Sequence, residues 1–175
     1  TGGAGAVGQY VIQFAKAAGA TVITTVSSPE KAALAREVGA DHTIDYKRED
    51  VGARVMEITG NKAVDAIIDM DIASNAKYVS AVLKPKGSVI IYGTSNPQAT
   101  IPAGFGIPNE TKYQFFIVYE LNRAERESAV SAITSAVERG TLKHRIANKT
   151  FPLADIVAAH EAVEKGSIGN VVVTM

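Results

Sequence analysis

The hydrophobic positions of the chain follow two alternating patterns. Val7, Val11 and Phe14 recur at helical spacing and predict an amphipathic helix over about residues 6 to 18. The next segment, TVITTV at residues 21 to 26, is rich in β-branched side chains and predicts a strand. The same succession of helix and strand then repeats along the chain.

Three further pairs of a helix and a strand are expected before the pattern changes. The helices are predicted at about residues 29 to 38, 49 to 58 and 75 to 83, and the strands at residues 42 to 46, 63 to 69 and 88 to 93, with a turn at Lys84-Pro85-Lys86-Gly87. Because short connections join strands and helices in alternation, the sheet should be parallel with helices on both faces. The predicted fold class is therefore α/β, with a doubly wound parallel sheet.

The alternation ends after Gly93. Residues 95 to 109 are rich in proline and glycine and are expected to form an irregular surface loop. The remaining elements are predicted as a strand at residues 112 to 121, helices at about residues 124 to 139 and 153 to 165, and a last strand at residues 170 to 175.

Composition narrows the function classes. The 175 residues suffice for one domain, and 18 basic and 18 acidic residues cancel, so no overall field attracts nucleic acid or an anionic membrane. The sequence has no cysteine, which excludes disulfides and thiolate metal sites and is typical of a reducing cytoplasm, the expected location. The three histidines do not cluster with carboxylates at metal-ligand spacing, so no metal is expected.

A glycine motif opens the first predicted helix. Gly3, Gly5 and Gly8 have the spacing G-x-G-x-x-G, and Ala6 and Val7 lie between them at the helix start. In a dinucleotide fold these glycines permit a tight turn, approach of the backbone to a pyrophosphate, and close packing of the helix. The motif alone is weak, and the alternative is a tight turn without a ligand. Its place before a series of βαβ units favours a cofactor site.

The residues after the strand at 21 to 26 bear on the choice of dinucleotide. A carboxylate there would bind the ribose hydroxyl of NAD, but the chain has Ser27, Ser28 and Lys31, which suit a 2′-phosphate. These residues favour NADP(H). In the alternative interpretation a serine caps the next helix and Lys31 is solvated, and both roles can coexist.

These motifs carry a resemblance to a known family. The run from Gly2 to Tyr46, followed by VDAIID and SVIIYGTSN, resembles the nucleotide-binding half of the medium-chain dehydrogenase/reductase superfamily, most closely its zinc-independent quinone oxidoreductases. The resemblance implies that NADPH is bound by the glycine turn, Ser27, Lys31 and Tyr46. It further implies that the ribose and nicotinamide lie near Asp69, Tyr92, Gly93, Thr94 and Ser95. Residues 70 to 74 depart from the small, glycine-containing turn of the family.

The resemblance also implies a domain organisation. Residues 1 to 145 correspond to the Rossmann-type dinucleotide-binding domain, and residues 146 to 175 to a helix and strand that return to the catalytic domain. The chain is expected to lack the family's N-terminal catalytic domain and first central strand, so that it is a piece of a larger enzyme. Residues 171 to 174, from this chain or a neighbouring one, are the expected substitute for that strand.

The function implied is hydride transfer from NADPH to a quinone or an α,β-unsaturated carbonyl, with this chain inactive alone and no catalytic residue assigned. The alternatives are the cofactor domain of an alcohol dehydrogenase or enoyl reductase of the same superfamily, and an NADP(H)-binding module without catalysis. Besides the small-molecule substrate, the expected partner is a second copy, bound through the strand at residues 112 to 121, since this run is apolar on both faces.

Overall fold

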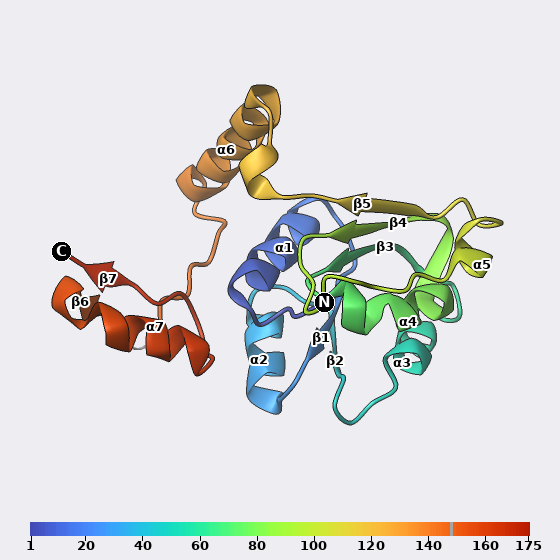
Figure 1. The fold of residues 1–175 in the computed structure, drawn as a ribbon, viewed down its shortest axis with the longest axis horizontal. Coiled ribbons are helices and arrows are strands. Elements are labelled where there is room, and N and C mark those ends of the chain that lie inside the picture. Colours follow the sequence, from blue (N-terminus) through green and yellow to red (C-terminus); the bar gives the residue numbers. More distant parts are fainter. Residues whose placement is uncertain (148) are drawn as a thin grey trace.

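The computed structural model describes residues 1–147 and 149–175, and its elements alternate as predicted (Figure 1). In chain order they are α1 (Ala6–Ala17), β1 (Ile23–Val26), α2 (Pro29–Glu37), β2 (His42–Asp45), α3 (Val51–Ile58), β3 (Val64–Asp69), α4 (Ile72–Val82), β4 (Leu83–Ile91), α5 (Ala103–Gly106), β5 (Lys112–Phe115), the 3-10 helix η1 (Val118–Glu120), α6 (Arg123–Glu138), β6 (Phe151–Pro152), the 3-10 helix η2 (Leu153–Asp155), α7 (Ile156–Glu164) and β7 (Val173–Thr174).

The strands are parallel, and helices cover both faces. β1 pairs with β2, while β3, β4 and β5 pair in that order. Side chains of β1 alternate between the faces: Val26 is buried with α1 and α2, whereas Ile23 packs against the cluster of α3 and α4. The predicted doubly wound α/β class is therefore confirmed.

The first three residues of the chain lie between β1 and β3. The amide of Gly3 donates to the carbonyl of Thr25 at 3.2 Å, and the main-chain nitrogen of Thr1 donates to the carbonyl of Ile68 at 2.6 Å. These bonds join the carboxyl ends of the two strands. Since α1 starts immediately afterwards, its amino end is fixed at the same edge of the sheet.

Residues 171 to 174 do not occupy the position between β1 and β3 in this chain, so that part of the prediction is wrong. Val173 pairs with Phe151, so β7 is parallel to β6, and α7 connects the two strands. The reason is local: β6 and β7 are the two strands of a single crossover unit, and pairing within such a unit closes a short loop. This C-terminal unit lies away from the main sheet, at the left in Figure 1.

Several predicted boundaries are also wrong. β5 ends at Phe115, not at residue 121, because it pairs with β4 only as far as Ile91. The predicted turn at residues 84 to 87 lies within β4, as a shift in register between the pairs formed by Val64 and Ala66. α4 begins at Ile72, three residues earlier than predicted, and the loop at residues 95 to 109 contains the short helix α5.

The link to the C-terminal unit is attached to α1. The buried side chain of Gln13 accepts from the amide of Lys143 at 2.6 Å and donates to its carbonyl at 3.1 Å. Tyr10, one turn earlier on α1, hydrogen bonds to His144 at 3.0 Å. The segment that leaves the sheet region is thus bound to the helix that follows the glycine turn.

Candidate functional site

Two glycines of the turn are required by close packing. A methyl group on Gly8 would overlap the carbonyl oxygen of Gly2 and lie 2.9 Å from the α-carbon of Gly3. A methyl group on Gly3 would lie 2.9 Å from the β-carbon of Thr24. At Gly5, by contrast, the nearest atom would be the carbonyl oxygen of Gly2 at 3.3 Å, so this glycine has an open side.

The amino end of α1 presents unpaired amides. No side chain caps the helix at Gly5, its first turn contains no acidic residue, and the first main-chain bond runs from Gln9 to Gly5. Among the described residues, the amides of Ala6, Val7 and Gly8 therefore have no acceptor. Gly5, Ala6 and Val7 are exposed. Free amides at a helix start bind anions, and the residues here fit a pyrophosphate.

A second group of predicted residues lies at the carboxyl ends of β1 and β2. The amide of Tyr46 donates to the carbonyl of Val26 at 3.1 Å, so Tyr46 and Ser27 follow neighbouring strand ends. Ser28 accepts from the amide of Lys31 at 3.3 Å and caps α2, which confirms the capping role for this serine. In the described part of the chain Lys31 has no carboxylate within 4.0 Å, so its ammonium is available to a phosphate.

Asp69 lies at the end of β3 and is only 1% exposed. Its Oδ1 accepts from the hydroxyl of Thr1 and from the side-chain amide of Asn75, both at 2.7 Å. Its Oδ2 has no hydrogen-bond partner among the described residues. The carboxylate thus fixes the chain before the glycine turn to α4, and its predicted contact with cofactor stays a prediction.

Tyr92 and Gly93 follow β4, next to the end of β3. Burial, and to a smaller degree the charge of Asp69, raise the pKa of Tyr92, so its phenol is neutral at neutral pH. A methyl group on Gly93 would overlap the carbonyl oxygen of Met70 and lie 3.2 Å from its carbonyl carbon. Gly93 thus permits the ends of the two strands to approach closely.

Met70, Asp71 and Thr25 also shape the site, and none was among the predicted site residues. The sulfur of Met70 lies over Gly2, and the hydroxyl of Thr25 accepts from the amide of Gly2 at 3.1 Å. Asp71 binds Ser95 in the loop after β4. For Met70 and Asp71, the only signal in the sequence was that residues 70 to 74 depart from the family's small turn. Nothing in the sequence indicated a role for Thr25.

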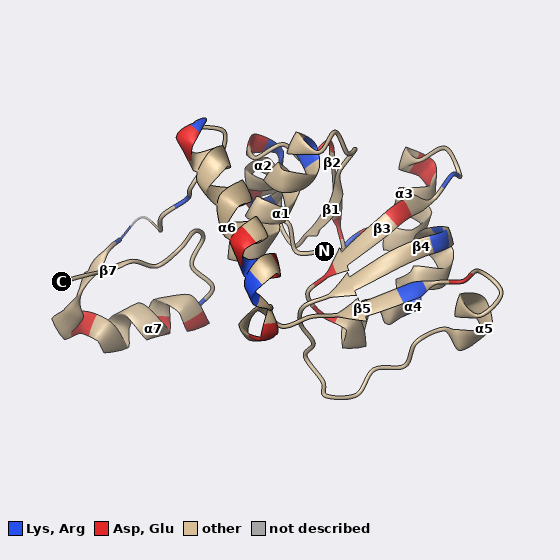
Figure 2. Cartoon of the chain, turned by 90° about the horizontal axis from the view of Figure 1, so that it is seen from above, with Lys and Arg blue, Asp and Glu red and all other residues tan. Residues whose placement is uncertain are grey.

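A cavity of about 1070 Å³ opens beside Tyr92 and Gly93. One wall is apolar, formed by Ile72, Ile91 and residues 115–117, and the other is the loop of residues 94–101, which includes Thr94, Asn96 and Gln98. The charged residues of β4 and β5 lie at the starts of these strands, away from the cavity (Figure 2). An uncharged cavity of this size suits a small organic molecule.

The sequence profile of the zinc-binding dehydrogenase family matches residues 6–135. The chain belongs to this family. It is 34% identical over 179 residues to a 2-haloacrylate reductase from a Burkholderia species, covering 97% of this chain and 52% of that protein. It is 32% identical over 168 residues to quinone oxidoreductase 1 of Escherichia coli, covering 92% of this chain and 51% of the relative.

The fold is shared with solved members of the family. The structure of an Escherichia coli quinone oxidoreductase complexed with NADPH matches 99% of this chain and 55% of its own, with a TM-score of 0.86 and 29% identity. The predicted resemblance to quinone oxidoreductases is therefore confirmed. The chain spans about half the length of these relatives.

The described residues form neither a membrane-spanning helix nor a cluster of metal ligands. Residues 1–147 and 149–175 contain no helix that is both long and apolar enough to cross a membrane. In the same ranges, no three histidine, aspartate or glutamate side chains gather as metal ligands would.

Proposed function

We propose that this chain binds NADP(H) and is the cofactor-binding part of an oxidoreductase that transfers hydride from NADPH to a quinone or an α,β-unsaturated carbonyl. The observation that carries the proposal is the amino end of α1, where exposed free amides follow a turn in which packing requires glycine at Gly3 and Gly8. The relatives support the substrate class, because a quinone and a 2-haloacrylate both contain an activated carbon–carbon double bond.

Each group at the strand ends has a separate part in binding. The amides of Ala6 and Val7 bind the pyrophosphate, while Ser27 and Lys31 bind the 2′-phosphate, with Tyr46 beside the adenosine. When bound, NADPH supplies the hydride, and the protein supplies orientation. The cavity beside Tyr92 receives the substrate, and the neutral phenol of Tyr92 is a hydrogen-bond donor at its edge.

Replacing Lys31 tests the cofactor assignment. Lys31→Ala should weaken NADPH binding by about 10- to 100-fold, the loss of one charge-assisted contact, and leave NADH binding nearly unchanged. Titration of the fluorescence of each nicotinamide measures both affinities, and the chain contains no tryptophan to interfere. Lys62→Ala, an exposed lysine after α3, is the control. Equal affinities for NADPH and NADH in the unmodified chain would contradict the proposal.

A second candidate function is cofactor binding without turnover by this chain alone. It is favoured by the cavity, whose lining contains no charged residue and has one open side. With NADPH and a simple quinone, we expect no reduction above the uncatalysed rate. Oxidation of NADPH by the chain at a rate that rises with protein concentration would refute this candidate.

We also propose a homodimer formed through residues 112–121. β5 is the edge strand of its sheet, and Phe115 and Tyr119 are 67% and 79% exposed. An apolar edge of this kind invites pairing with a second copy. Phe115→Asp should convert a dimer to a monomer in sedimentation velocity, whereas Ile107→Asp, at an equally exposed site outside the edge, should not. A monomeric unmodified chain would disprove the dimer.

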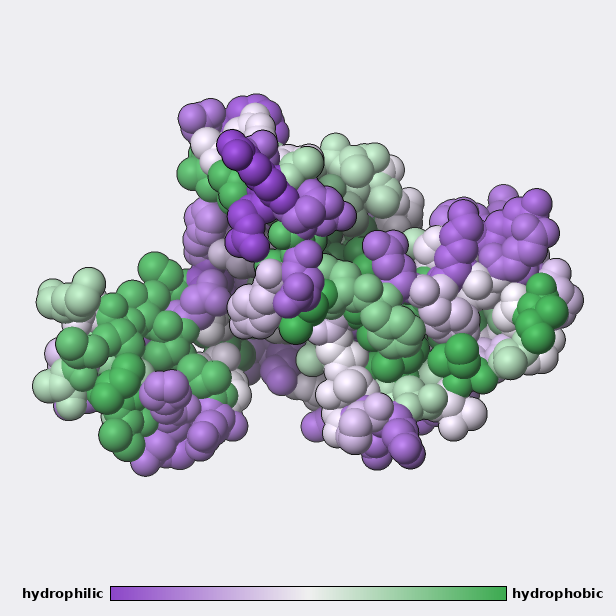
Figure 3. Space-filling model, turned by 45° about the horizontal axis from the view of Figure 1, so that its top comes forward, coloured by the Kyte–Doolittle hydropathy of each residue, from purple (hydrophilic) through white to green (hydrophobic). Residues whose placement is uncertain are grey.

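The domain boundary after residue 145 is part of the proposal. Among residues 1–147 and 149–175, β6 and β7 pair only with each other, and Leu153, Val157 and Val163 are exposed on this unit, where hydrophobic residues gather in Figure 3. Residues 146–175 would therefore pack on the catalytic domain. A chain ending at Arg145 should retain the NADPH affinity of the full chain, and a large loss of affinity would place the boundary elsewhere.

We also propose that the chemistry does not depend on zinc and that the protein is located in the cytoplasm. The support is the resemblance to zinc-independent quinone oxidoreductases and, within these 175 residues alone, the lack of any cysteine to act as a thiolate ligand or to form a disulfide. A chelator should leave NADPH affinity unchanged, and fractionation of the source cells should find the protein in the cytoplasm. A zinc requirement for binding would contradict the first part.

A further inference from the structure

The loop of residues 94–101 forms the polar wall of the cavity, and local hydrogen bonds shape it. The hydroxyl of Thr94 donates to the carbonyl of Asn96 at 2.7 Å, and the amide of Gln98 donates to the side chain of Asn96 at 2.9 Å. These bonds stay within the loop. They define its turns but do not attach it to the sheet.

Ser95 makes that attachment. Its amide and its hydroxyl each donate to Oδ1 of Asp71 at 2.8 Å. Apart from the bond that the amide of Ala103, at the start of α5, donates to the carbonyl of Ile101 at 2.9 Å, these are the only hydrogen bonds across residues 1–147 and 149–175 that join residues 94–101 to another segment, and none but these reaches the strand ends. The hydrogen bonding that attaches this wall of the cavity to the strand ends therefore depends on one carboxylate.

The carboxylate continues a series of bonds between the ends of β3 and β4. The amide of Tyr92 donates to the carbonyl of Asp69 at 3.0 Å, and the amide of Ile72 donates to the carbonyl of Gly93 at 3.3 Å. After Asp71 the chain turns into α4, so no further carbonyl can face the loop. The side chain of Asp71 takes the place of that carbonyl and accepts from Ser95.

The bonds to Ser95 are charge-assisted. The hydroxyl of Ser74, and next the amide of Ser95, stabilise the carboxylate and lower the pKa of Asp71. The side chain is therefore ionised at neutral pH, and bonds to an ionised acceptor are stronger than neutral ones.

The geometry points to Asp71 as a positioning residue that holds residues 94–101 as the polar wall of the cavity and so limits the size of substrate that the cavity accepts. The inference rests on the proposed function for the identity of the cavity, and it adds the residue that sets the cavity's shape. Without the carboxylate, the loop has no hydrogen bond to the sheet, and its polar groups lose their fixed position beside Tyr92.

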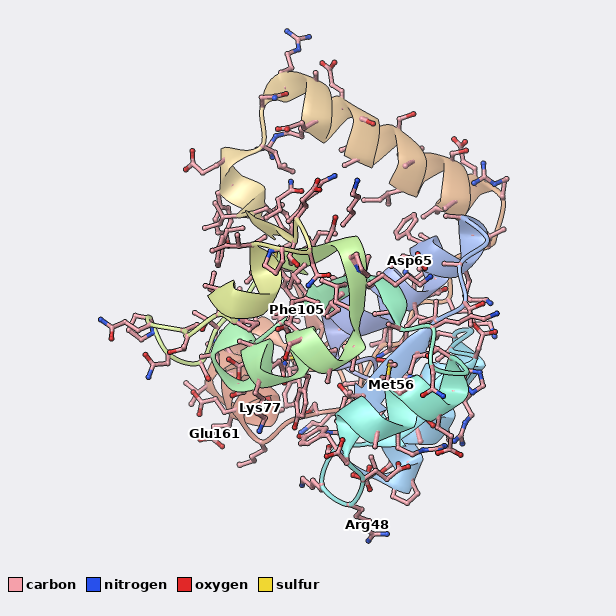
Figure 4. The ribbon with its side chains drawn as sticks, turned by 90° about the vertical axis from the view of Figure 1, so that its right-hand side faces the viewer. Arg48, Met56, Asp65, Lys77, Phe105 and Glu161 are labelled. Atoms are coloured by element: carbon pink, nitrogen blue, oxygen red, sulfur yellow. The ribbon has the colours of Figure 1, made fainter. Side chains whose placement is uncertain are left out.

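Hydrogen exchange of the 175-residue chain tests the attachment directly. In Asp71→Ala, amides of residues 94–101 should exchange at least about tenfold faster, the factor expected for loss of one hydrogen bond to a charged group. Asp71→Asn retains an oxygen acceptor and should restore most of the protection. The control is Asp65→Ala, an exposed aspartate of β3, labelled in Figure 4, whose partner is Lys84.

A second variant keeps the test decisive if Asp71→Ala does not fold. Ser95 is exposed, and Ser95→Ala removes one of the two bonds without altering the start of α4. Its exchange over residues 94–101 should be faster than in the unmodified chain. Exchange equal to that of the Asp65→Ala control, in whichever Asp71 or Ser95 variant folds, would overturn the inference.

Titration with NADPH separates this inference from the proposed function. If the cofactor binds, the unmodified chain should show added protection of residues 94–101, and Asp71→Ala should lose most of it. Faster exchange in Asp71→Ala together with no NADPH binding by the unmodified chain would support the attachment and refute the proposed cofactor. NADPH binding with unchanged exchange in Asp71→Ala would support the proposed cofactor and refute the attachment.

Discussion

We expect the glycine turn to need glycine for two different reasons: packing at Gly8 and access of the pyrophosphate at Gly5. Substituting each residue separately distinguishes the two. Gly8 lies in the first turn of α1, where a methyl group would be 2.9 Å from the α-carbon of Gly3 and would overlap the carbonyl of Gly2. Both neighbours are main-chain atoms, so they cannot rotate away as a side chain could. Gly8→Ala must therefore move the helix or the turn.

The magnitude follows from two opposing effects. Alanine favours a helix over glycine by about 1 kcal/mol, while forcing a methyl group into a packed contact costs about 1–3 kcal/mol. Because the overlapped atoms are main chain, the packing cost lies at the upper end of this range, and we expect Gly8→Ala to lower the free energy of unfolding by about 2 kcal/mol, a fall in Tm of roughly 4–8 °C for a chain of this size. NADPH affinity should fall with it, because the free amides of α1 move.

Gly5→Ala is the matched substitution with the opposite outcome. Its methyl group would meet only the carbonyl oxygen of Gly2, at 3.3 Å, on an exposed surface. The cost in stability should stay below about 1 kcal/mol, the usual penalty of alanine at a helix N-cap. Affinity for NADPH should nevertheless fall more than tenfold, since the methyl group stands where the pyrophosphate approaches.

Urea unfolding followed by circular dichroism measures stability, and NADPH fluorescence measures affinity. Gly104→Ala, where no atom lies within 4 Å of the added methyl group, is the control. A Gly8→Ala chain as stable as the control would refute the packing argument. A Gly5→Ala chain with undiminished NADPH affinity would refute the assignment of the pyrophosphate to this turn.

Three further substitutions test contacts that stabilise the fold away from the glycine turn. Asp41→Asn should lower the free energy of unfolding by about 1 kcal/mol at pH 7, since bonds from Lys16 and then Val22 lower the pKa of Asp41. This contribution is present above the unfolded pKa of about 3.9 and is lost as pH falls through the lower folded pKa. A difference between variant and parent that persists in acid unfolding at pH 2 would contradict it. Tyr113→Phe should leave the urea midpoint unchanged or higher, because the buried Tyr113 hydroxyl has no partner among the described residues, and a clear drop would reveal one. Gln13→Ala should destabilise the chain by about 1–3 kcal/mol, since it leaves both main-chain groups of Lys143 without their partner; an unchanged unfolding free energy would show that this contact is dispensable.

The elements that the sequence predicted well are those whose pattern is local. Hydrophobic spacing in α1 and the β-branched run ending at Val26 depend only on neighbouring residues, and both elements lie where they were expected. The residues predicted around the glycine turn also lie together, at the carboxyl edge of the strands, because parallel connections bring successive strand ends to one edge.

The features that escaped prediction depend on contacts between distant residues. An apolar run continues to residue 121, but β5 stops at Phe115 because its partner β4 ends there. The pairing of Val173 with Phe151 likewise depends on where the chain turns, not on the composition of either segment. The role of Asp71 requires Ser95, 24 residues away, so nothing in the local sequence could assign it.

The hydrogen bonds between Gln13 and Lys143 connect α1 to the C-terminal part of the chain. Gln13 lies eight residues after Gly5, about 12 Å along a helix axis. The segment leading to residues 149–175 is therefore hydrogen bonded to α1 at a point remote from the amino end of the helix. A single helix therefore carries both this contact and the free amides at its amino end, so the link between the C-terminal unit and the glycine turn does not pass through a strand.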